Sequence, residues 1–221
     1  VLGLSALIFP ISIYYNNIKR DLYIYLAGSA LFVFFAFDGR LSRFEGMIFF
    51  ISLIFYVLLS IRHPNGEETS SEDRLDAPMG RLVAYLIGGI LLLGFGADLF
   101  VDGAIFMARL LGISEIIIGM SVVAFGTSLP ELATSAMAAY HKESAISIGN
   151  IIGSNIFNIL SVLGISSMIQ PLDSPKSIMT LEVPIMIGYG LVMILIAKLN
   201  QPLHRIASSI LLAGYFIFLY L

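Results

Sequence analysis

The sequence predicts an all-α membrane protein built from an inverted internal repeat, and three observations lead to this fold class. Of the 221 residues, 58% are apolar and only 12% are charged, whereas an ordinary soluble domain carries about 25% charged residues. Long runs without any charge recur along the chain, and two distant stretches resemble each other. This composition excludes a soluble enzyme, a nucleic-acid-binding protein and a disordered chain.

Charge and cysteine content narrow the function classes further. The formal net charge of −3 is too weak to attract nucleic acid. The chain has no cysteine, which excludes a disulfide framework and thiolate metal sites. We therefore expect a protein whose environment is the lipid bilayer, with no enzymatic activity and no cofactor.

The charge-free runs predict seven membrane-spanning helices and the tail of another. A helix needs roughly 20 mostly apolar residues to cross a hydrocarbon core about 30 Å thick, and flanking Lys or Arg can extend a shorter run. The apolar residues 1–15 are expected to form the tail. The predicted spans are 22–37, 46–61, 82–97, 116–130, 144–172, 183–197 and 206–221.

The internal repeat relates the start of the chain to its second half. Residues 1–11 (VLGLSALIFPI) match residues 162–172 (VLGISSMIQPL) at six of eleven positions, with an offset of 161. Leu41-Ser-Arg before one apolar run similarly matches Leu203-His-Arg before the last run. The second copy begins five spans after the first, and an odd number of crossings reverses orientation. The repeat is therefore inverted, which is the usual plan of secondary transporters.

The polar segment 62–81 is predicted to be a mobile linker. Eight Lys and Arg residues lie in the loops on its side of the membrane and four in the other loops, so the positive-inside rule places the linker in the cytoplasm. The predicted domains are the C-terminal part of a first repeat (1–61), the cytoplasmic linker (62–80) and a complete second repeat with the ion-binding motifs (81–221).

Two segments of the second repeat are polar although apolar residues flank them. In the first, VVAFGTSLPEL, Pro130 cannot donate a backbone hydrogen bond and clashes with the carbonyl of Gly126. We expect the helix to break between these two residues, which frees nearby carbonyls to bind a cation. Thr127 and Glu131 are four residues apart and share one helix face. A carboxylate at membrane depth is costly and is a functional candidate by default.

The second segment, IGNIIGSNIFN, carries Asn150, Ser154 and Asn158 at four-residue spacing on one helix face. Gly149 and Gly153 predict a strip where a neighbouring helix approaches closely. Together the two segments offer carboxylate, amide, hydroxyl and carbonyl oxygens but no His or Cys. Such ligands favour hard ions such as Ca²⁺ or Na⁺ over transition metals.

These segments closely resemble the alpha-repeat signature of the sodium/calcium exchanger family, within the cation/calcium exchanger superfamily. The matching motifs are GTSLPE at 126–131 and GNIIGSN at 149–155, and the resemblance covers essentially the whole chain. It implies an exchanger fold of five plus five helices, of bacterial or archaeal type and truncated at its N-terminus here. By analogy with the second repeat, roughly 80 residues are expected upstream, and this chain alone is not expected to transport.

The resemblance also implies the ion ligands. Potassium-dependent members usually carry Asp at the position of Asn158, so this residue argues against potassium co-transport. Asn150 and Asn155 could equally serve in helix packing. The residues carried over by position are Glu131 as the acidic ligand, with Thr127, Ser128, the Ala124 carbonyl, Ser154 and Asn158, and Asn155 and Asn150 as further candidates.

The implied function is a secondary antiporter that exchanges Ca²⁺ for Na⁺ across the plasma (cell inner) membrane by alternating access. A near alternative is a Ca²⁺/H⁺ antiporter in which Glu131 carries a proton, because burial disfavours the charged form of an acid. A cation channel is a distant alternative, since it needs a continuous polar pore and these polar residues cluster at one depth. The sequence leaves the coupling ion, the stoichiometry and the oligomeric state open.

Overall fold

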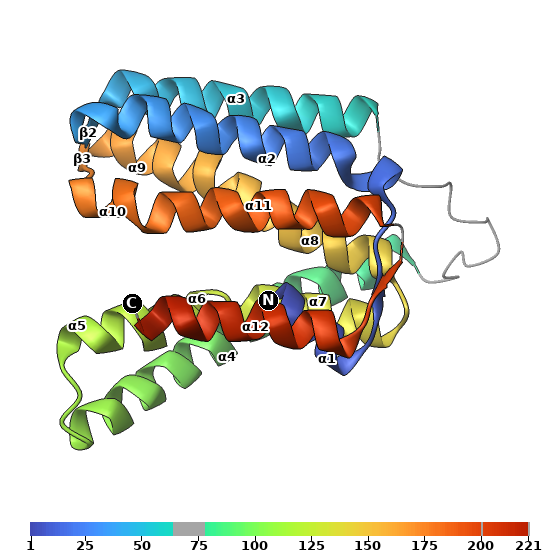
Figure 1. Cartoon of the computed structure of the whole chain (residues 1–221). Helices are drawn as coiled ribbons and strands as arrows, with labels where there is room; N and C mark the ends of the chain where they lie inside the picture. The colour runs from blue at the N-terminus through green and yellow to red at the C-terminus, as the bar shows by residue number, and fades with distance from the viewer. Residues whose placement is uncertain (64–77, 200, 221) are drawn as a thin grey trace. The chain divides into compact units, whose positions relative to one another are not determined.

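The computed structural model describes residues 1–63, 78–199 and 201–220, most of which are helical (Figure 1). Most of the predicted linker, residues 64–77, lies outside the described residues. In chain order the elements are α1 (Leu2–Ile8), β1 (Ile11–Ser12), α2 (Tyr15–Phe35), η1 (Ala36–Asp38), β2 (Arg40–Leu41), α3 (Arg43–Arg62), α4 (Met79–Leu110), α5 (Glu115–Ile118), η3 (Gly119–Val123), α6 (Ala124–Thr127), α7 (Leu129–Tyr140), α8 (Ser144–Phe157), η4 (Asn158–Leu163), α9 (Gly164–Ile169), β3 (Leu172–Asp173), α10 (Lys176–Thr180), α11 (Glu182–Lys198), β4 (Pro202–Leu203) and α12 (Arg205–Tyr220).

The multi-pass helical architecture predicted from the sequence is confirmed. Within the described residues, five helices are long and apolar enough to cross a membrane, and α12 is a shorter apolar helix. The remaining predicted span, 116–130, is not one continuous helix, because it is divided among α5, η3, α6 and the start of α7. The five long spans are Tyr15–Asp38, Arg43–Arg62, Met79–Leu110, Ser144–Ile169 and Ile178–Lys198.

The helices group into two compact units. Unit 1 contains α1, α4 to α7 and α12, and unit 2 contains α2, α3, α8 to α11 and the strands β1 to β4. In unit 1, α1 packs against both α7 and α12, and the ring of Phe9 meets that of Tyr140 edge-on at 5.0 Å. In unit 2, α3 packs on α9, and α2 packs on α8 and α11. Each unit thus combines helices from both sequence repeats.

Two short antiparallel strand pairs in unit 2 reveal the inverted repeat. Ile11 of β1 lies opposite Leu203 of β4, and Leu41 of β2 lies opposite Leu172 of β3. The sequence repeat relates Ile11 to Leu172 and Leu41 to Leu203, so the same pairing is made twice. The pair β1–β4 joins the start of α2 to the end of α11. The pair β2–β3 lies at the other end of these helices, after the end of α2 and before the start of α11. The repeat-equivalent helices α2 and α11 therefore run antiparallel, as the inverted repeat predicts.

The contact between α2 and α11 is close. The Tyr25 hydroxyl donates a hydrogen bond to the Met186 carbonyl (2.9 Å), and these two residues are 161 positions apart, as repeat equivalents are. A Cβ atom on Gly190 would lie 2.5 Å from the Tyr25 ring. A side chain at Gly190 would therefore push the two helices apart.

One type of glycine-mediated helix crossing is found in both units. In unit 1, a Cβ atom on Gly3 of α1 would lie 3.0 Å from the Ser208 carbonyl oxygen of α12. In unit 2, a Cβ atom on Gly164 of α9 would lie 3.2 Å from the Gly46 carbonyl oxygen of α3. The repeat relates Gly3 to Gly164 and Ser208 to Gly46. Since small residues let helix backbones approach closely, both copies of the repeat retain the same packing device.

Local signals explain where several helices begin and end. Ser42 and Glu45 form a capping box at the start of α3, with the Ser42 amide donating to Glu45 Oε2 at 2.7 Å. After α4 the chain reverses at Gly112, whose φ of +73° is readily adopted by glycine. After α7 it reverses at Lys142, with a φ of +64°. The turn at Lys142 separates α7 and α8, the two helices that carry most of the candidate ligands.

Candidate functional site

The predicted helix break lies at Ser128 in unit 1. Helix α6 ends at Thr127, Ser128 has φ −94° and ψ 1°, and α7 begins at Leu129 with Pro130 in its first turn. Proline is tolerated there because the first turn of a helix needs no backbone donor. The break expected between Gly126 and Pro130 is therefore confirmed.

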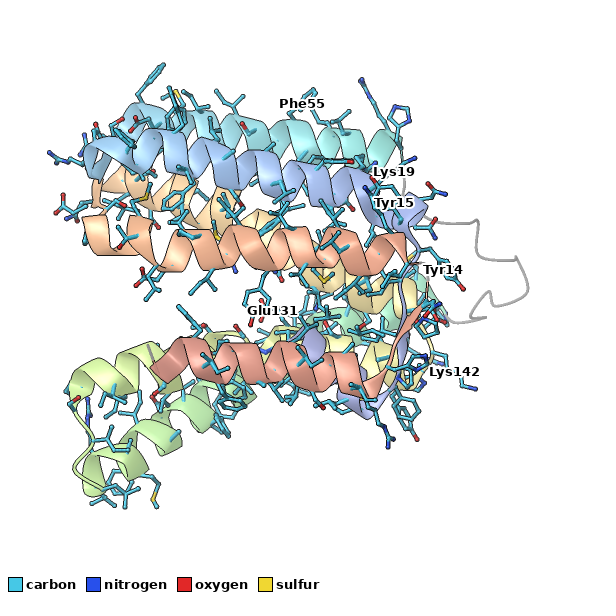
Figure 2. The ribbon with its side chains drawn as sticks, viewed as in Figure 1. Tyr14, Tyr15, Lys19, Phe55, Glu131 and Lys142 are labelled. Atoms are coloured by element: carbon cyan, nitrogen blue, oxygen red, sulfur yellow. The ribbon has the colours of Figure 1, made fainter. Side chains whose placement is uncertain are left out.

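Glu131 follows Pro130 in the first turn of α7, where Figure 2 labels its side chain. This turn is the positive end of the helix dipole, which favours a carboxylate. The side chain is half-buried, and its Oε2 atom is shielded from solvent. The Thr134 hydroxyl donates to the Pro130 carbonyl at 2.8 Å and supports the same turn. The break thus holds a carboxylate in a defined, partly desolvated position.

Two hydroxyl groups converge on the carbonyl of Ala124. Thr127 Oγ1 donates to it at 3.0 Å, and Ser128 Oγ donates at 3.5 Å. The expectation that carbonyls at the break are left free is therefore wrong for Ala124, because these two hydroxyls donate to it. A hydroxyl that donates keeps its lone pairs, and a carbonyl oxygen has two. The two hydroxyl oxygens can therefore still ligate a cation, whereas the Ala124 carbonyl must exchange one of its two hydrogen bonds for the ion.

Gly126, within the first motif, has a packing role. It is buried, and a Cβ atom there would overlap the side chain of Val101 on α4. Helix α4 therefore packs directly on the broken helix at this glycine, and a larger residue there would have to displace the Val101 side chain.

Unit 2 carries the second predicted set on α8 and η4. The Ser154 hydroxyl and the Asn155 amide nitrogen both donate to the Ile151 carbonyl, at 3.1 and 2.7 Å. Because its nitrogen is engaged, Asn155 presents its amide oxygen to other partners. Asn150 and Ser154 are half-buried, whereas Asn158 is exposed and opens η4.

The glycine strip predicted on α8 is not used for packing by the described residues. Among the described residues, no atom of another element lies within 4 Å of a Cβ placed on Gly149 or Gly153. In the described part of the chain no helix occupies this strip, so its use for close helix approach stays a prediction.

Two π-helical segments adjoin the predicted ligands, and sequence reasoning missed both. Segment η3 ends immediately before Ala124, and η4 begins at Asn158. Single π-turns inside α-helices are rare and are frequent at functional sites. Hydrophobic periodicity could not reveal them, because five or six residues do not distinguish a wide turn from an ordinary one. Each predicted ligand set thus lies beside an irregular stretch of helix.

The donor set has the chemistry of a hard-cation site. Among the described residues, no group of three or more His, Cys, Asp or Glu is placed to hold a metal ion. The candidate ligands are instead the Glu131 carboxylate with hydroxyl, amide and carbonyl oxygens. Such oxygens suit Ca²⁺ and Na⁺.

Comparison with known proteins adds independent findings. A family model described as "Sodium/calcium exchanger protein" matches residues 81–221, which contain every predicted ion ligand. The uncharacterized membrane protein MJ0091 of Methanocaldococcus jannaschii is 35% identical over 221 residues, covering 98% of this chain and 70% of the relative. The sodium/calcium exchanger MaX1 of Methanosarcina acetivorans is 29% identical over 260 residues, covering 99% and 74% respectively.

A solved structure shares the fold. This structure is of the sodium-calcium exchanger NCX_Mj soaked with Na⁺, and it matches with a TM-score of 0.78 at 33% sequence identity. The match covers 98% of this chain and 70% of the solved chain. The similarity thus extends over nearly all of the present sequence.

Proposed function

Because the chain belongs to the sodium/calcium exchanger protein family, we propose that it exchanges Ca²⁺ for Na⁺ across the plasma (cell inner) membrane by alternating access. Its family and its apolar helices make it a multi-pass membrane protein of cation/calcium antiport. One observation carries the finer proposal. Glu131 stands at a helix break beside two hydroxyl groups that converge on the Ala124 carbonyl.

The proposal assigns cation ligands to both units. In unit 1 they are Glu131, Thr127, Ser128 and the Ala124 carbonyl. On α8 and η4 of unit 2 the assigned ligands are Ser154 and Asn158, with Asn155 and Asn150 as additional candidates.

Exchange rather than leakage follows from the charge on Glu131. A carboxylate at membrane depth costs a few kcal/mol, which opposes any rearrangement of the ion-free protein that moves Glu131 out of water. Bound Ca²⁺ or Na⁺ compensates the charge and lowers that barrier. The protein then changes its side of access mainly when it is loaded, which couples the two ion flows. The inverted repeat provides two similar arrangements between which such a protein can alternate.

A Ca²⁺/H⁺ antiporter is the second candidate, because Glu131 Oε2 is shielded from solvent. A shielded carboxylate can be neutralised by a proton as well as by Na⁺. The ligand chemistry of the hydroxyls and amides is the same in both cases. Only the driving gradient differs.

The experiment that tests the proposal imposes one gradient at a time. The product of the complete gene is reconstituted in vesicles, and uptake of radioactive calcium is measured after loading the vesicles with Na⁺ or with protons. We expect uptake from Na⁺-loaded vesicles and little from acid-loaded ones at equal internal and external Na⁺. Uptake driven by the proton gradient alone would replace Na⁺ with H⁺ as the coupling ion.

A further inference from the structure

We propose that an anionic phospholipid headgroup binds at one end of unit 2, on a surface formed by Tyr15, Lys19 and Tyr23 of α2 with Lys198 of α11. We call this the α2–α11 cationic surface. Figure 2 shows Tyr15 and Lys19 together at the N-terminal end of α2. The proposal is independent of which ions the protein exchanges.

The surface brings two ammonium groups and two phenols to one end of an antiparallel helix pair. Tyr15, Lys19 and Tyr23 follow one another at four-residue spacing, which places them on one face of α2. The hydroxyls of Tyr15 and Tyr23 are 2.8 Å apart, and Lys198 Nζ lies 5.8 Å from the centre of the Tyr15 ring. Lys19 Nζ lies 3.5 Å from Asn16 Oδ1, so this side chain reaches back toward the end of the helix. Lysines near a membrane surface extend in this way.

Neither ammonium group has an acidic partner among the residues that the structure describes. Within the described part of the chain, no carboxylate lies within 4.0 Å of the nitrogen of Lys19 or Lys198. The adjacent Arg20 behaves differently, since it pairs with Asp21 at 3.0 Å. Arg20 also donates to the Ser60 hydroxyl and to the His63 carbonyl of the α3 end. Helix α2 therefore engages its arginine within the fold and leaves its lysine charge available to an external anion.

Apolar side chains beside these charges favour a phospholipid over a free anion. On α11, Leu195 and Leu191 precede Lys198 by about one and two turns and are 64% and 50% exposed. A lipid with its phosphate at Lys198 can lay an acyl chain along these leucines, whereas inorganic phosphate gains nothing from them. Tyrosines are enriched at the membrane–water interface, and basic pockets between membrane helices bind anionic headgroups.

The test measures lipid retention by native mass spectrometry. The product of the complete gene is purified in detergent and titrated with phosphatidylglycerol or phosphatidylcholine. The variant K19Q/K198Q removes both charges and keeps both tyrosines. Each basic group near an anionic surface raises the binding affinity roughly fivefold. Loss of both groups should therefore weaken the binding of phosphatidylglycerol about 30-fold. Retention of phosphatidylcholine should stay low and unchanged.

Two further variants make the result specific. K142N/R205Q removes two exposed cations of unit 1, and Asn tolerates the positive φ at Lys142. This control should bind phosphatidylglycerol like the unmodified protein, and K19R/K198R should retain it because the charge is kept. The proposal is overturned if K19Q/K198Q binds phosphatidylglycerol normally, if K142N/R205Q loses it equally, or if K19R/K198R fails to retain it. Displacement of the lipid by millimolar inorganic phosphate would identify a free-anion site instead.

Discussion

At the scale of single residues, the proposed exchange depends most on the carboxylate of Glu131. Glu131→Gln keeps the size of the side chain and its place in the first turn of α7 but removes the charge. Loss of one partner from a desolvated charge pair costs about 2 kcal/mol or more, so calcium affinity should fall at least ~30-fold. Glu143→Gln, at an exposed position, should transport normally. Near-normal calcium uptake by Glu131→Gln, at equal expression, would remove Glu131 from the mechanism.

Asn158 offers a residue-scale test of the ligands assigned to unit 2. It is exposed at the start of η4, so Asn158→Asp should fold normally while adding a titratable oxygen one turn beyond Ser154. We expect altered competition between Na⁺ and Ca²⁺, or a changed pH profile of uptake. Asn16→Asp, exposed near the start of α2, should change neither. Unchanged competition curves and pH profile for Asn158→Asp would exclude it as a ligand.

At the scale of elements, the crossing of α3 and α9 should tolerate no added bulk. A Cβ atom on Gly46 would lie 2.6 Å from the Gly164 carbonyl oxygen and 2.9 Å from the Met168 amide nitrogen. Such overpacking costs about 1–3 kcal/mol, which exceeds the gain of about 1 kcal/mol in helix propensity on changing Gly to Ala. Gly46→Ala should therefore lower the melting temperature in detergent. At Gly188 no described atom lies within 4 Å of an added Cβ, so Gly188→Ala should keep or raise the melting temperature. Equal changes in melting temperature for the two variants would contradict a tight contact between α3 and α9.

The turn between α4 and α5 should loosen as the pH falls. Glu115 accepts two hydrogen bonds from Arg109, at 2.7 and 3.0 Å, and these bonds lower the pKa of Glu115 below its ordinary value. A lowered carboxylate pKa stabilises the fold above the unfolded pKa of about 4.3, and the stabilisation disappears as the pH falls below that value. The pair is exposed, so high salt should weaken it.

Amide hydrogen exchange of residues 110–115 measures this effect. At neutral pH, Glu115→Gln should exchange faster there than the unmodified protein. The difference should shrink as the pH falls below the unfolded pKa of about 4.3 and vanish once Glu115 is protonated in the folded protein. A difference that persists in acid would mean that the ion pair does not hold the turn.

Several elements could be predicted from the sequence because their causes are local or periodic. Pro130 is disfavoured in the interior of a helix, so a helix boundary is expected just before it, and the break is found at Ser128. The repeat at offset 161 predicted an inverted pair, which is found in α2 and α11. The hydroxyl bonds to the Ala124 carbonyl were not predictable, because they depend on side-chain rotamers at the break. The two π-segments leave no periodic signal, and the grouping into two units depends on long-range packing.

At the scale of the whole molecule, the duplicated sequence makes equivalent contacts more than once. The crossing of α1 with α12 in unit 1 repeats that of α9 with α3 in unit 2, down to the glycine at each contact. The strand pairs β1–β4 and β2–β3 repeat in the same way. Matching contacts give the two copies of the repeat similar internal energies. That equality is what a transporter needs if neither direction of access is to dominate.

The central claim, obligatory exchange, is tested most directly by following both ions in the same vesicles. The product of the complete gene is reconstituted, the vesicles are loaded with radioactive sodium, and radioactive calcium is added outside. The account predicts calcium influx and sodium efflux that start together, stay in a fixed ratio as either concentration varies, and stop together in Glu131→Gln. Calcium influx that continues at full rate without sodium inside, while the pH is equal on both sides, would contradict the account and indicate a channel.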